Sequence, residues 1–356
     1  MVIGFDGSRA FVNKRTGTEN YSYQLLKSLS LIDHKNKYIV YLRPGNNPGK
    51  DWPNNFLFKE IKWPRLWTQG GLAIQTFKDK LDVLFIPAHT SPLFHRPGLK
   101  TVVTVHDLGA EYLPQLHQLK QRLYLNWVTI YLLKNATKLI AVSKATKDDL
   151  INKIGIDLKK IEVVYEGYDK DKFKIQNSKI KNSVQAKDYY LFVGTVQPRK
   201  NLARLIKAMV EISGNLVIAG SKGWDADAIY ALPKKLGIEK RIKFLGYVPD
   251  QDLPGLYSEA EAFVFPSLFE GFGLPILEAQ ASGCPVLTSN LSSMSEVAGK
   301  GAVYVNPYSV ESIIEGMKSL QSTANRLQLI KKGLENVKKF SWENCAKETL
   351  KVLESV

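Results

Sequence analysis

The sequence predicts an α/β fold made of two doubly wound domains, in each of which helices cover both faces of a parallel sheet. Apolar runs of about four to six residues alternate with helix-like stretches, as expected of buried parallel strands. The same plan occurs twice along the 356 residues. Most of these runs end in Gly, Asp, His, Ser or Thr, and ligands of open α/β sheets bind outside such carboxyl ends of the strands. The three observations predict two domains that each present a polar sheet edge.

The expected elements divide the chain into four parts. Residues 1–168 form a first Rossmann-like domain, 169–187 a polar, lysine-rich linker, 188–340 a second Rossmann-like domain, and 341–356 a last helix with the option of crossing back to the first domain. The strands expected in the first domain are 2–6, 37–43, 83–88, 101–107, 138–143 and 160–167, with helices at 19–30 and 118–135. Those expected in the second domain are 189–195, 215–221, 242–248, 262–267, 284–289 and 302–306.

Composition indicates a globular protein of a reducing compartment. Hydrophobic residues make up 44% of the chain and charged residues 23%. No apolar run approaches the roughly 18 residues of a membrane span, and the first residues run straight into a strand without a signal-peptide pattern. Cys284 and Cys345 lie far apart, which does not suit a disulfide framework. These features predict a cytoplasmic protein.

The net charge of +15 belongs almost entirely to the first half of the chain. Residues 1–187 hold 30 Lys and Arg against 16 Asp and Glu, whereas residues 188–356 hold 19 against 18. Nucleic acid, an anionic membrane surface, a phosphorylated acceptor or a plain solvated lysine face would each account for this asymmetry. We discount nucleic acid because the apolar positions of 116–133 are typical of a helix face packed on a sheet.

Aromatic residues beside cations favour the membrane surface. They occur in two groups: Lys62, Trp63, Arg65 and Trp67, and Lys120, Arg122, Tyr124 and Trp127. Such pairs suit a lipid interface, where attachment would be peripheral and reversible. The alternative is that the tryptophans pack inside the domain.

Two glutamates stand eight positions apart in the stretch SLFEGFGLPILEAQASGCPV. Pro275 is expected to begin a helix and Gly283 to end it, so Glu270 lies in the preceding loop and Glu278 in the first helical turn. The backbone at the start of this helix can bind an anion. Glu278 suits a pair of ribose hydroxyls, and Glu270 could reach sugar hydroxyls or a developing positive centre. A solvated loop acid and a helix-dipole contact are the plain alternatives.

Arg199 and Lys200 follow the first strand of the second half, in GTVQPRKN. A guanidinium and an ammonium in one loop suit phosphate oxygens, although a surface basic pair beside the helix near Leu202 is the alternative. With the two glutamates, they predict a pocket for a sugar linked to a nucleoside diphosphate.

The same stretches carry a family resemblance. GTVQPRKNLARLIKA, the segment FLGYVPDQDLPGLYSEAEAFVFPSLFEGFGLPILEAQASGCPVLTSNLSSMSEVAG and TVVTVHDL with IAVSKATKDDL resemble glycosyltransferase family 4, whose members are retaining enzymes of the GT-B fold. The likeness runs from IGFDGSRA to SWENCAKETL, and this version of the motifs is similar to mannosyltransferase-like members. Two departures, Gln280 and Ser295, do not touch the implied chemistry.

The resemblance implies a role for each matching residue. Arg199 and Lys200 match the residues that hold the donor diphosphate, Glu270 the acid on the donor sugar, and Glu278 the acid on the ribose. Phe272, Gly273 and Leu274 match the backbone donors at the helix start. His106 matches a first-domain histidine near the transferred sugar, and Gly17 the glycine of a loop that closes over the donor. From the residues alone, His106 is a strand-end histidine and Gly17 a turn glycine.

No cofactor and no metal ion are expected. The expected donor substrate is a GDP- or UDP-linked sugar, with GDP-mannose preferred. Asp225 and Asp227 spell a DxD sequence, but they read better as acids at a helix start. The charge that gathers on the leaving diphosphate would be stabilised by Arg199 and Lys200. A covalent glycosyl-glutamate and a same-face substitution both stay open as mechanisms.

The resemblance implies a hexosyltransferase that acts on a glycan or lipid-linked saccharide in cell-envelope polysaccharide biosynthesis. Other classes of protein are the alternatives. A dinucleotide-dependent oxidoreductase is disfavoured, because no G-x-G-x-x-G follows the first strand. A GT-B enzyme of other chemistry, such as an epimerase or phosphorylase, and a non-catalytic sugar-nucleotide or nucleic-acid binding protein remain alternatives. The expected location is cytoplasmic, with the inner face of the membrane as the peripheral option.

Overall fold

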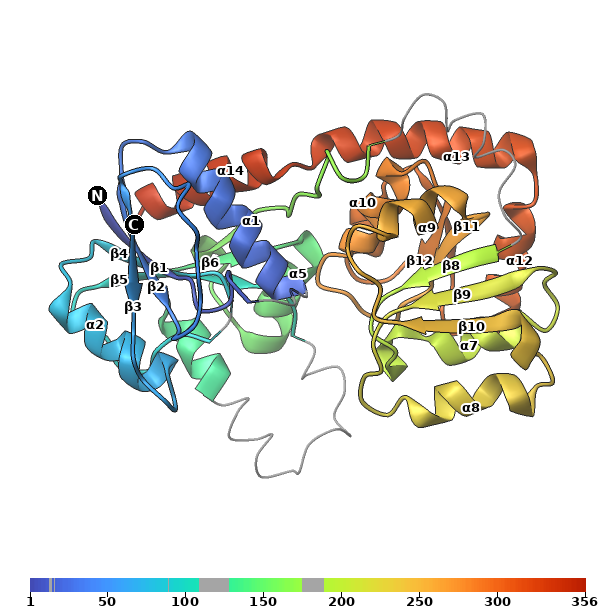
Figure 1. Ribbon diagram of the computed structural model, residues 1–356, viewed down its shortest axis with the longest axis horizontal. Helices are drawn as coiled ribbons and strands as arrows, with labels where there is room; N and C mark the ends of the chain where they lie inside the picture. The colour runs from blue at the N-terminus through green and yellow to red at the C-terminus, as the bar shows by residue number, and fades with distance from the viewer. Residues whose placement is uncertain (13–14, 16, 89, 109–127, 175–188) are drawn as a thin grey trace. The chain divides into compact units, whose positions relative to one another are not determined.

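The computed structural model describes residues 1–12, 15, 17–88, 90–108, 128–174 and 189–356. These residues divide into two compact units, which are described separately (Figure 1). Unit 1 comprises residues 1–167 together with 342–356, and unit 2 comprises residues 168–341. The last helix therefore belongs to unit 1, and the first residues of the predicted linker belong to unit 2. The rest of that linker, from 175 onward, lies outside the described residues.

Unit 1 contains a seven-stranded parallel sheet in the order β3-β2-β1-β4-β5-β6-β7. Its strands are β1 (Val2–Asp6), β2 (Lys37–Leu42), β3 (Phe56–Glu60), β4 (Val83–Ile86), β5 (Lys100–Val105), β6 (Lys138–Ala141) and β7 (Ile161–Val163). The central strands are buried on both faces, which explains their uninterrupted apolar sequences. The direction of strand order reverses between β1 and β4, where a doubly wound sheet has its topological switch point.

Helical segments cover this sheet. They are α1 (Gly17–Ile32), a π-helical turn (Thr68–Leu72), α2 (Ala73–Lys78), α5 (Lys144–Asp149), a second π-helical turn (Leu150–Ile154), a 3-10 turn (Leu158–Lys160) and α14 (Trp342–Glu354). Residues 128–135 of the helix predicted at 118–135 are helical, and its earlier part lies outside the described residues. Helices α1 and α14 pack side by side (Figure 1). The Asn36 amide also donates to Glu354 Oε1 at 3.0 Å, so the end of the chain is tied to unit 1.

Unit 2 contains a six-stranded parallel sheet in the order β10-β9-β8-β11-β12-β13. Its strands are β8 (Tyr189–Val193), β9 (Asn215–Ala219), β10 (Ile242–Gly246), β11 (Ala262–Phe265), β12 (Val286–Ser289) and β13 (Ala302–Val305). Its helices are α7 (Leu202–Ala208), α8 (Asp227–Lys235), α9 (Leu253–Glu259), α10 (Leu274–Ala281), α11 (Met294–Ala298), α12 (Val310–Ser319) and α13 (Thr323–Asn336). Short 3-10 turns lie at Pro198–Lys200, Glu239–Arg241 and Val337–Lys339.

The helices of unit 2 form two packed groups. Helix α7 contacts α8 and α12, whereas α10 contacts α9, α11 and α13 (Figure 1). The switch point of this sheet lies between β8 and β11. The backbone is close-packed there: a Cβ at Gly220, after β9, would lie 1.9 Å from the Gly194 carbonyl oxygen, after β8. The loops that follow β8 and β9 are therefore in close backbone contact.

The predicted and observed elements differ at β3 and at the start of α10. Every one of the twelve predicted runs contains a strand. Strand β3, in contrast, was not predicted. Helix α10 begins at Leu274, so Glu278 is its fifth residue. The expectation that Glu278 lies in the first turn was wrong, because Gly273 rather than a later residue takes the N-cap position.

Gln280, one of the two departures from the family pattern, is part of a buried polar network. Its amide nitrogen donates to the Ala298 and Gly301 carbonyls, and its oxygen accepts from Asn336, at 2.9 Å. Asn336 also donates to the Val297 carbonyl at 2.7 Å. Buried amides require such partners, so the network fixes α10 against α11 and α13. Gln280 thus holds in place the helix that carries Glu278.

Candidate active site

The predicted donor residues of unit 2 come from the two loops that flank the switch point of its sheet. The loop after β8 carries Arg199 and Lys200, and the loop after β11 carries Glu270. Because β8 and β11 are neighbouring parallel strands, both loops leave the same carboxyl edge. This is the position at which doubly wound sheets bind ligands.

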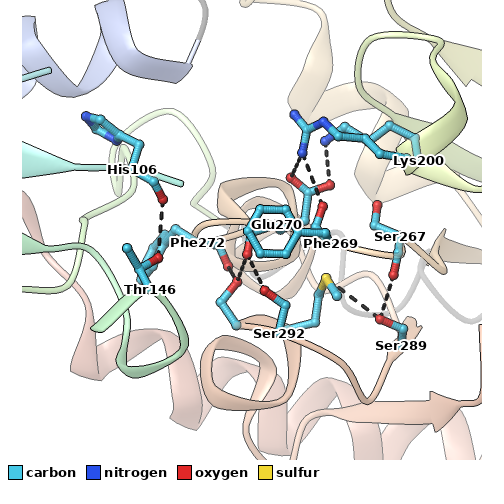
Figure 2. A network of polar contacts seen from close by, with 12 residues as sticks. His106, Thr146, Lys200, Ser267, Phe269, Glu270, Phe272, Ser289 and Ser292 are labelled. Atoms are coloured by element: carbon cyan, nitrogen blue, oxygen red, sulfur yellow. Dashed lines mark hydrogen bonds and ion pairs between the residues drawn. The ribbon is translucent and has the colours of Figure 1, made fainter. Parts of the chain in front are cut away.

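Glu270 lies between the two cations of the neighbouring loop. Its Oε1 is 2.6 Å from Lys200 Nζ, and its Oε2 is 3.2 Å from Arg199 Nη1 (Figure 2). The side chains of Glu270 and Lys200 are each 9% exposed, whereas that of Arg199 is 22% exposed. Two positive charges and one negative charge therefore share a small, mostly dry space. The arrangement retains one net positive charge for an anionic ligand.

The two cations set the protonation of Glu270. Burial alone would raise the pKa of this carboxyl, but the charges of Lys200 and Arg199 and the hydrogen bond from Lys200 lower it overall. A carboxyl with a depressed pKa stabilises the fold above its ordinary value of 4.5 and loses that contribution as the pH falls through its folded value. Glu270 is therefore an anion throughout the neutral range.

Backbone contacts hold both loops in place. The Leu268 amide donates to the Arg199 carbonyl at 2.9 Å, which joins the two loops directly. Ser292 and Ser293 donate from their hydroxyls to the Glu270 carbonyl at 2.6 and 2.9 Å (Figure 2). Asn201, with a positive φ of 60°, donates to the Pro266 and Pro307 carbonyls. The positions of Glu270 and its two cations are thus fixed before a ligand arrives.

Helix α10 begins next to this cluster. Gly273 is its N-cap and has a φ of 106°, a conformation that suits glycine. Phe272 is buried and its ring meets that of Phe340 edge-on at 5.9 Å. The partial positive charge at the helix N-terminus adds to the positive charges of Arg199 and Lys200.

Glu278, in the second turn of α10, is half-buried and held by a tyrosine. The Tyr257 hydroxyl donates to its Oε2 at 2.9 Å, and the Tyr257 ring packs against Phe173 and Phe263. Burial raises the pKa of Glu278 to about 7, although the Tyr257 hydrogen bond opposes the shift. A raised carboxyl pKa means that the folded chain binds this proton more tightly than the unfolded chain does. The bound proton therefore stabilises the fold at low pH, and this contribution is lost as the pH rises through about 7.

His106 is a buried residue that follows β5 in unit 1. Its Nε2 lies 2.8 Å from the Pro87 carbonyl oxygen, and its Nδ1 lies 3.1 Å from Glu166 Oε1. Its backbone carbonyl accepts from the Thr146 hydroxyl at 3.3 Å (Figure 2). The Tyr21 ring meets the imidazole edge-on at 4.6 Å. The side chain is thus fixed by several elements of the same unit.

Gly17, the other candidate of unit 1, is the first residue of α1. A Cβ added to it would meet no atom within 4 Å among the residues that the structure describes. Nothing within this conformation of unit 1 therefore requires glycine at position 17.

Residues 15–172 match a family model described as Glycosyltransferase Family 4, and residues 173–335 match one described as Glycosyl transferases group 1. The O-antigen chain mannosyltransferase B of Escherichia coli is 31% identical over 78% of this chain and 75% of its own length. The O-antigen chain mannosyltransferase RfbU of Salmonella typhimurium is 32% identical over 65% of this chain and 63% of its own length.

The chain belongs to glycosyltransferase family 4. It is accordingly a glycosyltransferase, as the family resemblance of its motifs predicted. Among solved structures, the sucrose-phosphate synthase of Thermosynechococcus elongatus matches with a TM-score of 0.80 at 18% identity, over 99% of this chain and 98% of that one. WaaG, a glycosyltransferase involved in lipopolysaccharide biosynthesis, matches with a TM-score of 0.70 at 19% identity, over 98% of both chains. These structures confirm the GT-B fold.

The DxD sequence of this family 4 glycosyltransferase lies at the start of a helix. Asp227 is the first residue of α8 and pairs with Lys222, and Asp225 precedes it at a positive φ of 48°. In the part of the chain that the structure describes, no group of three or more His, Cys, Asp and Glu side chains could hold a metal ion. A helix long and apolar enough to cross a membrane is likewise not found among the described residues.

Sequence reasoning missed three functional features of this glycosyltransferase. It placed Glu270 on the donor sugar without anticipating its direct contact with Arg199 and Lys200. It did not single out Tyr257 or Glu166, which hold Glu278 and His106. The signal for Glu166 was weak: it is the last residue but one of the predicted strand 160–167, at the same sheet edge as His106. Tyr257 lies within a helix and gave no signal of its own.

Proposed function

We propose that this glycosyltransferase moves a hexosyl group, mannose, from a nucleoside diphosphate to a glycan or lipid-linked saccharide with retention of configuration. The observation that carries the proposal is the buried cluster of Glu270 with Arg199 and Lys200 at the switch point of unit 2, beside the N-terminus of α10. Such a cluster suits a ligand that joins an anionic diphosphate to a sugar.

The cations and the helix would act on the leaving group. As the glycosidic bond breaks, the nucleoside diphosphate gains negative charge. Arg199, Lys200 and the backbone at Gly273 and Leu274 would stabilise that charge without reorganising, because the loop contacts already fix them. The reaction then needs no metal ion to neutralise the diphosphate.

Glu270 and His106 would act at the sugar. Glu270 stays ionised, so it can stabilise positive charge at the anomeric carbon as the donor bond breaks. His106 is assigned to the transferred sugar by the family motif in which it stands. Retention is the expectation that the family resemblance gives, and Gly17 would let its loop approach the donor closely.

The relatives support the choice of sugar and product. Both curated relatives reported above are named O-antigen chain mannosyltransferases, which favours mannose as the sugar and envelope polysaccharide as the product. A solved structural relative, HepE of Anabaena, is described in complex with UDP and glucose, so a UDP-linked hexose is the competing donor. We propose GDP-mannose as the donor and a cytoplasmic location for the reaction.

Replacing Glu278 with alanine tests the donor assignment. We expect Glu278→Ala to weaken binding of GDP by about 1–3 kcal/mol, the scale of a lost hydrogen bond to a charged group. Because the pKa of Glu278 is about 7, GDP binding to the wild-type chain should weaken as the pH falls through that value, and the variant should lose this component. Isothermal titration calorimetry with GDP and UDP between pH 6 and pH 8 measures both effects.

The matched control is Glu315→Ala, which removes an exposed glutamate of α12 in the same unit. It should bind GDP as the wild-type chain does at every pH. Equal affinities of Glu278→Ala and wild type would show that Glu278 does not contact the nucleotide.

A membrane-near acceptor would explain the charge of the first half. Lys62, Trp63, Arg65 and Leu66 form an exposed basic and apolar segment, with Leu66 77% exposed and Trp63 40% exposed. Trp67 is instead buried and donates to the Ile61 carbonyl, so only part of the predicted group is available. The second predicted group, 120–127, lies outside the described residues. We propose that the segment 62–66 contacts an anionic membrane surface.

Charge reversal tests this contact. The double variant Lys62→Glu/Arg65→Glu should float less with anionic vesicles than the wild-type chain does, and wild-type binding should fall as salt rises. Reversal of two exposed lysines of unit 2, Lys318→Glu/Lys331→Glu, keeps the same net charge and should leave flotation unchanged. Equal flotation of the two double variants would assign any binding to overall charge rather than to this segment.

A further inference from the structure

The side chain of His106 makes two hydrogen bonds, each to an oxygen atom. A backbone carbonyl has no hydrogen to give, so the contact of Nε2 with Pro87 places a proton on Nε2. The contact of Nδ1 with Glu166 then has two possible proton arrangements. Either Nδ1 also carries a proton and the ring is an imidazolium beside a carboxylate, or the ring is neutral and Glu166 is a carboxylic acid.

The groups that face the ring favour the charged arrangement. Among the described residues they include Tyr21 of α1, Glu166 after β7 and Asp107 in the loop after β5, and Cys345 of α14 interacts in turn with Glu166 and Tyr21. Burial raises the pKa of both Tyr21 and Cys345, so these two stay neutral, while Asp107 and Glu166 attract a positive charge. Burial alone would lower the pKa of His106, but Glu166, the Pro87 carbonyl and Asp107 raise it above 6.5 overall.

The contacts of His106 also join the ends of four strands. Pro87 follows β4, His106 follows β5, Thr146 lies in the first turn of the helix after β6, and Glu166 follows β7. These are consecutive neighbours in the sheet. The imidazole therefore crosses from the β4 end to the β7 end at the edge where doubly wound sheets bind ligands.

We propose that Glu166 is a positioning residue for the transfer reaction, which holds His106 as an imidazolium with both ring N–H groups committed inside unit 1. In this arrangement neither ring nitrogen can exchange a proton with a sugar hydroxyl. His106 then serves the reaction as a fixed positive charge and as the anchor of the loop after β5, and proton transfer falls to other groups. The role in transfer rests on the proposed function, whereas the ion pair itself does not.

The protonation of the ring is measured directly by two-bond proton–nitrogen NMR correlation of the imidazole nitrogens in the full chain at pH 7.5. An imidazolium shows two equivalent, protonated nitrogens, whereas a neutral ring shows one protonated and one bare nitrogen. The chain has five histidines, and the signals that disappear in His106→Gln assign this one. Two protonated nitrogens are expected. One bare nitrogen in the wild-type chain would overturn the inference, without reference to any activity.

Glu166→Gln then tests the role of the carboxylate. A glutamine amide can still donate to Nδ1, so the geometry is kept while the negative charge is lost. We expect the ring to become neutral in this variant and transfer from GDP-mannose to fall at least about tenfold through kcat, with GDP affinity unchanged. In the wild-type chain transfer should fall only above the raised pKa of His106, and in the variant that fall should move about one pH unit or more lower.

The matched control is Glu162→Gln, the same change on β7 at the half-exposed partner of Lys138. It should leave the His106 signals and the pH profile as in the wild-type chain. An unchanged pH profile in Glu166→Gln would overturn the positioning role. An imidazolium in a wild-type chain that transfers no sugar would contradict the proposed function and leave the ion pair standing.

Discussion

The Glu270→Gln variant is expected to bind a nucleoside diphosphate more tightly than the wild-type chain and to lose sugar transfer. In the structure Glu270 neutralises one of the two positive charges that the diphosphate would meet. Removing its charge leaves Arg199 and Lys200 facing the ligand with their full charge, and we expect GDP affinity to rise by up to about tenfold, or about 1.4 kcal/mol. Transfer should fall by about 10²–10³-fold, as for the loss of a group that stabilises the transition state.

Calorimetry with GDP and a transfer assay with GDP-mannose separate these two effects. The same pair of measurements on Glu315→Ala controls for the loss of a glutamate elsewhere in unit 2. If Glu270→Gln lost GDP affinity and transfer in parallel, Glu270 would belong to the nucleotide site and its assignment to the sugar would be wrong. If both stayed unchanged, the cluster would be a structural ion pair alone.

Lys200→Met should cause the largest loss of stability. Methionine retains the apolar length of the side chain but removes the ammonium that lies 2.6 Å from Glu270 Oε1. The buried carboxylate would then keep only the partly exposed Arg199, and breaking a buried ion pair from one side costs about 3–5 kcal/mol. The variant should also bind GDP more weakly, because Arg199 alone would face the diphosphate.

Chemical denaturation of four chains measures this contribution. Lys200→Met should unfold at a lower denaturant concentration than wild type, and adding Glu270→Gln to it should restore part of the loss. Lys222→Met, which breaks the exposed pair with Asp227, should unfold as the wild-type chain does. A Lys200→Met chain as stable as wild type would show that the buried pair does not support the fold.

Most of the fold could be predicted because its signal is local. The central parallel strands of both units are buried on both faces, so they appear as continuous apolar runs that periodicity detects. Strand β3 escaped because it is an edge strand whose residues are only partly buried, and its sequence FLFKE ends in two charges. Its pairing with β2, including the stacked rings of Tyr38 and Phe56 at 4.2 Å, depends on a contact between distant segments.

The candidate site could be predicted as a set of residues but not as a set of contacts. Loop position and residue type placed Arg199, Lys200 and Glu270 at one sheet edge. Their mutual ion pairing depends on the side-by-side placement of β8 and β11, which lie about 70 residues apart. The same holds for Glu166 and His106, which are separated by 60 residues. Local pattern carries no information about such distances.

The proposed activity is the transfer of a hexosyl group from a nucleoside diphosphate sugar. The most direct test measures the release of GDP from GDP-mannose by the purified chain, with a chelator present and a lipid-linked saccharide fraction as acceptor, beside matched reactions with UDP-hexoses. We expect acceptor-dependent GDP release by the wild-type chain, with at most about one hundredth of that rate in Glu270→Gln. Acceptor-independent release, equal release by Glu270→Gln, or no release from any of the nucleotide sugars would contradict it.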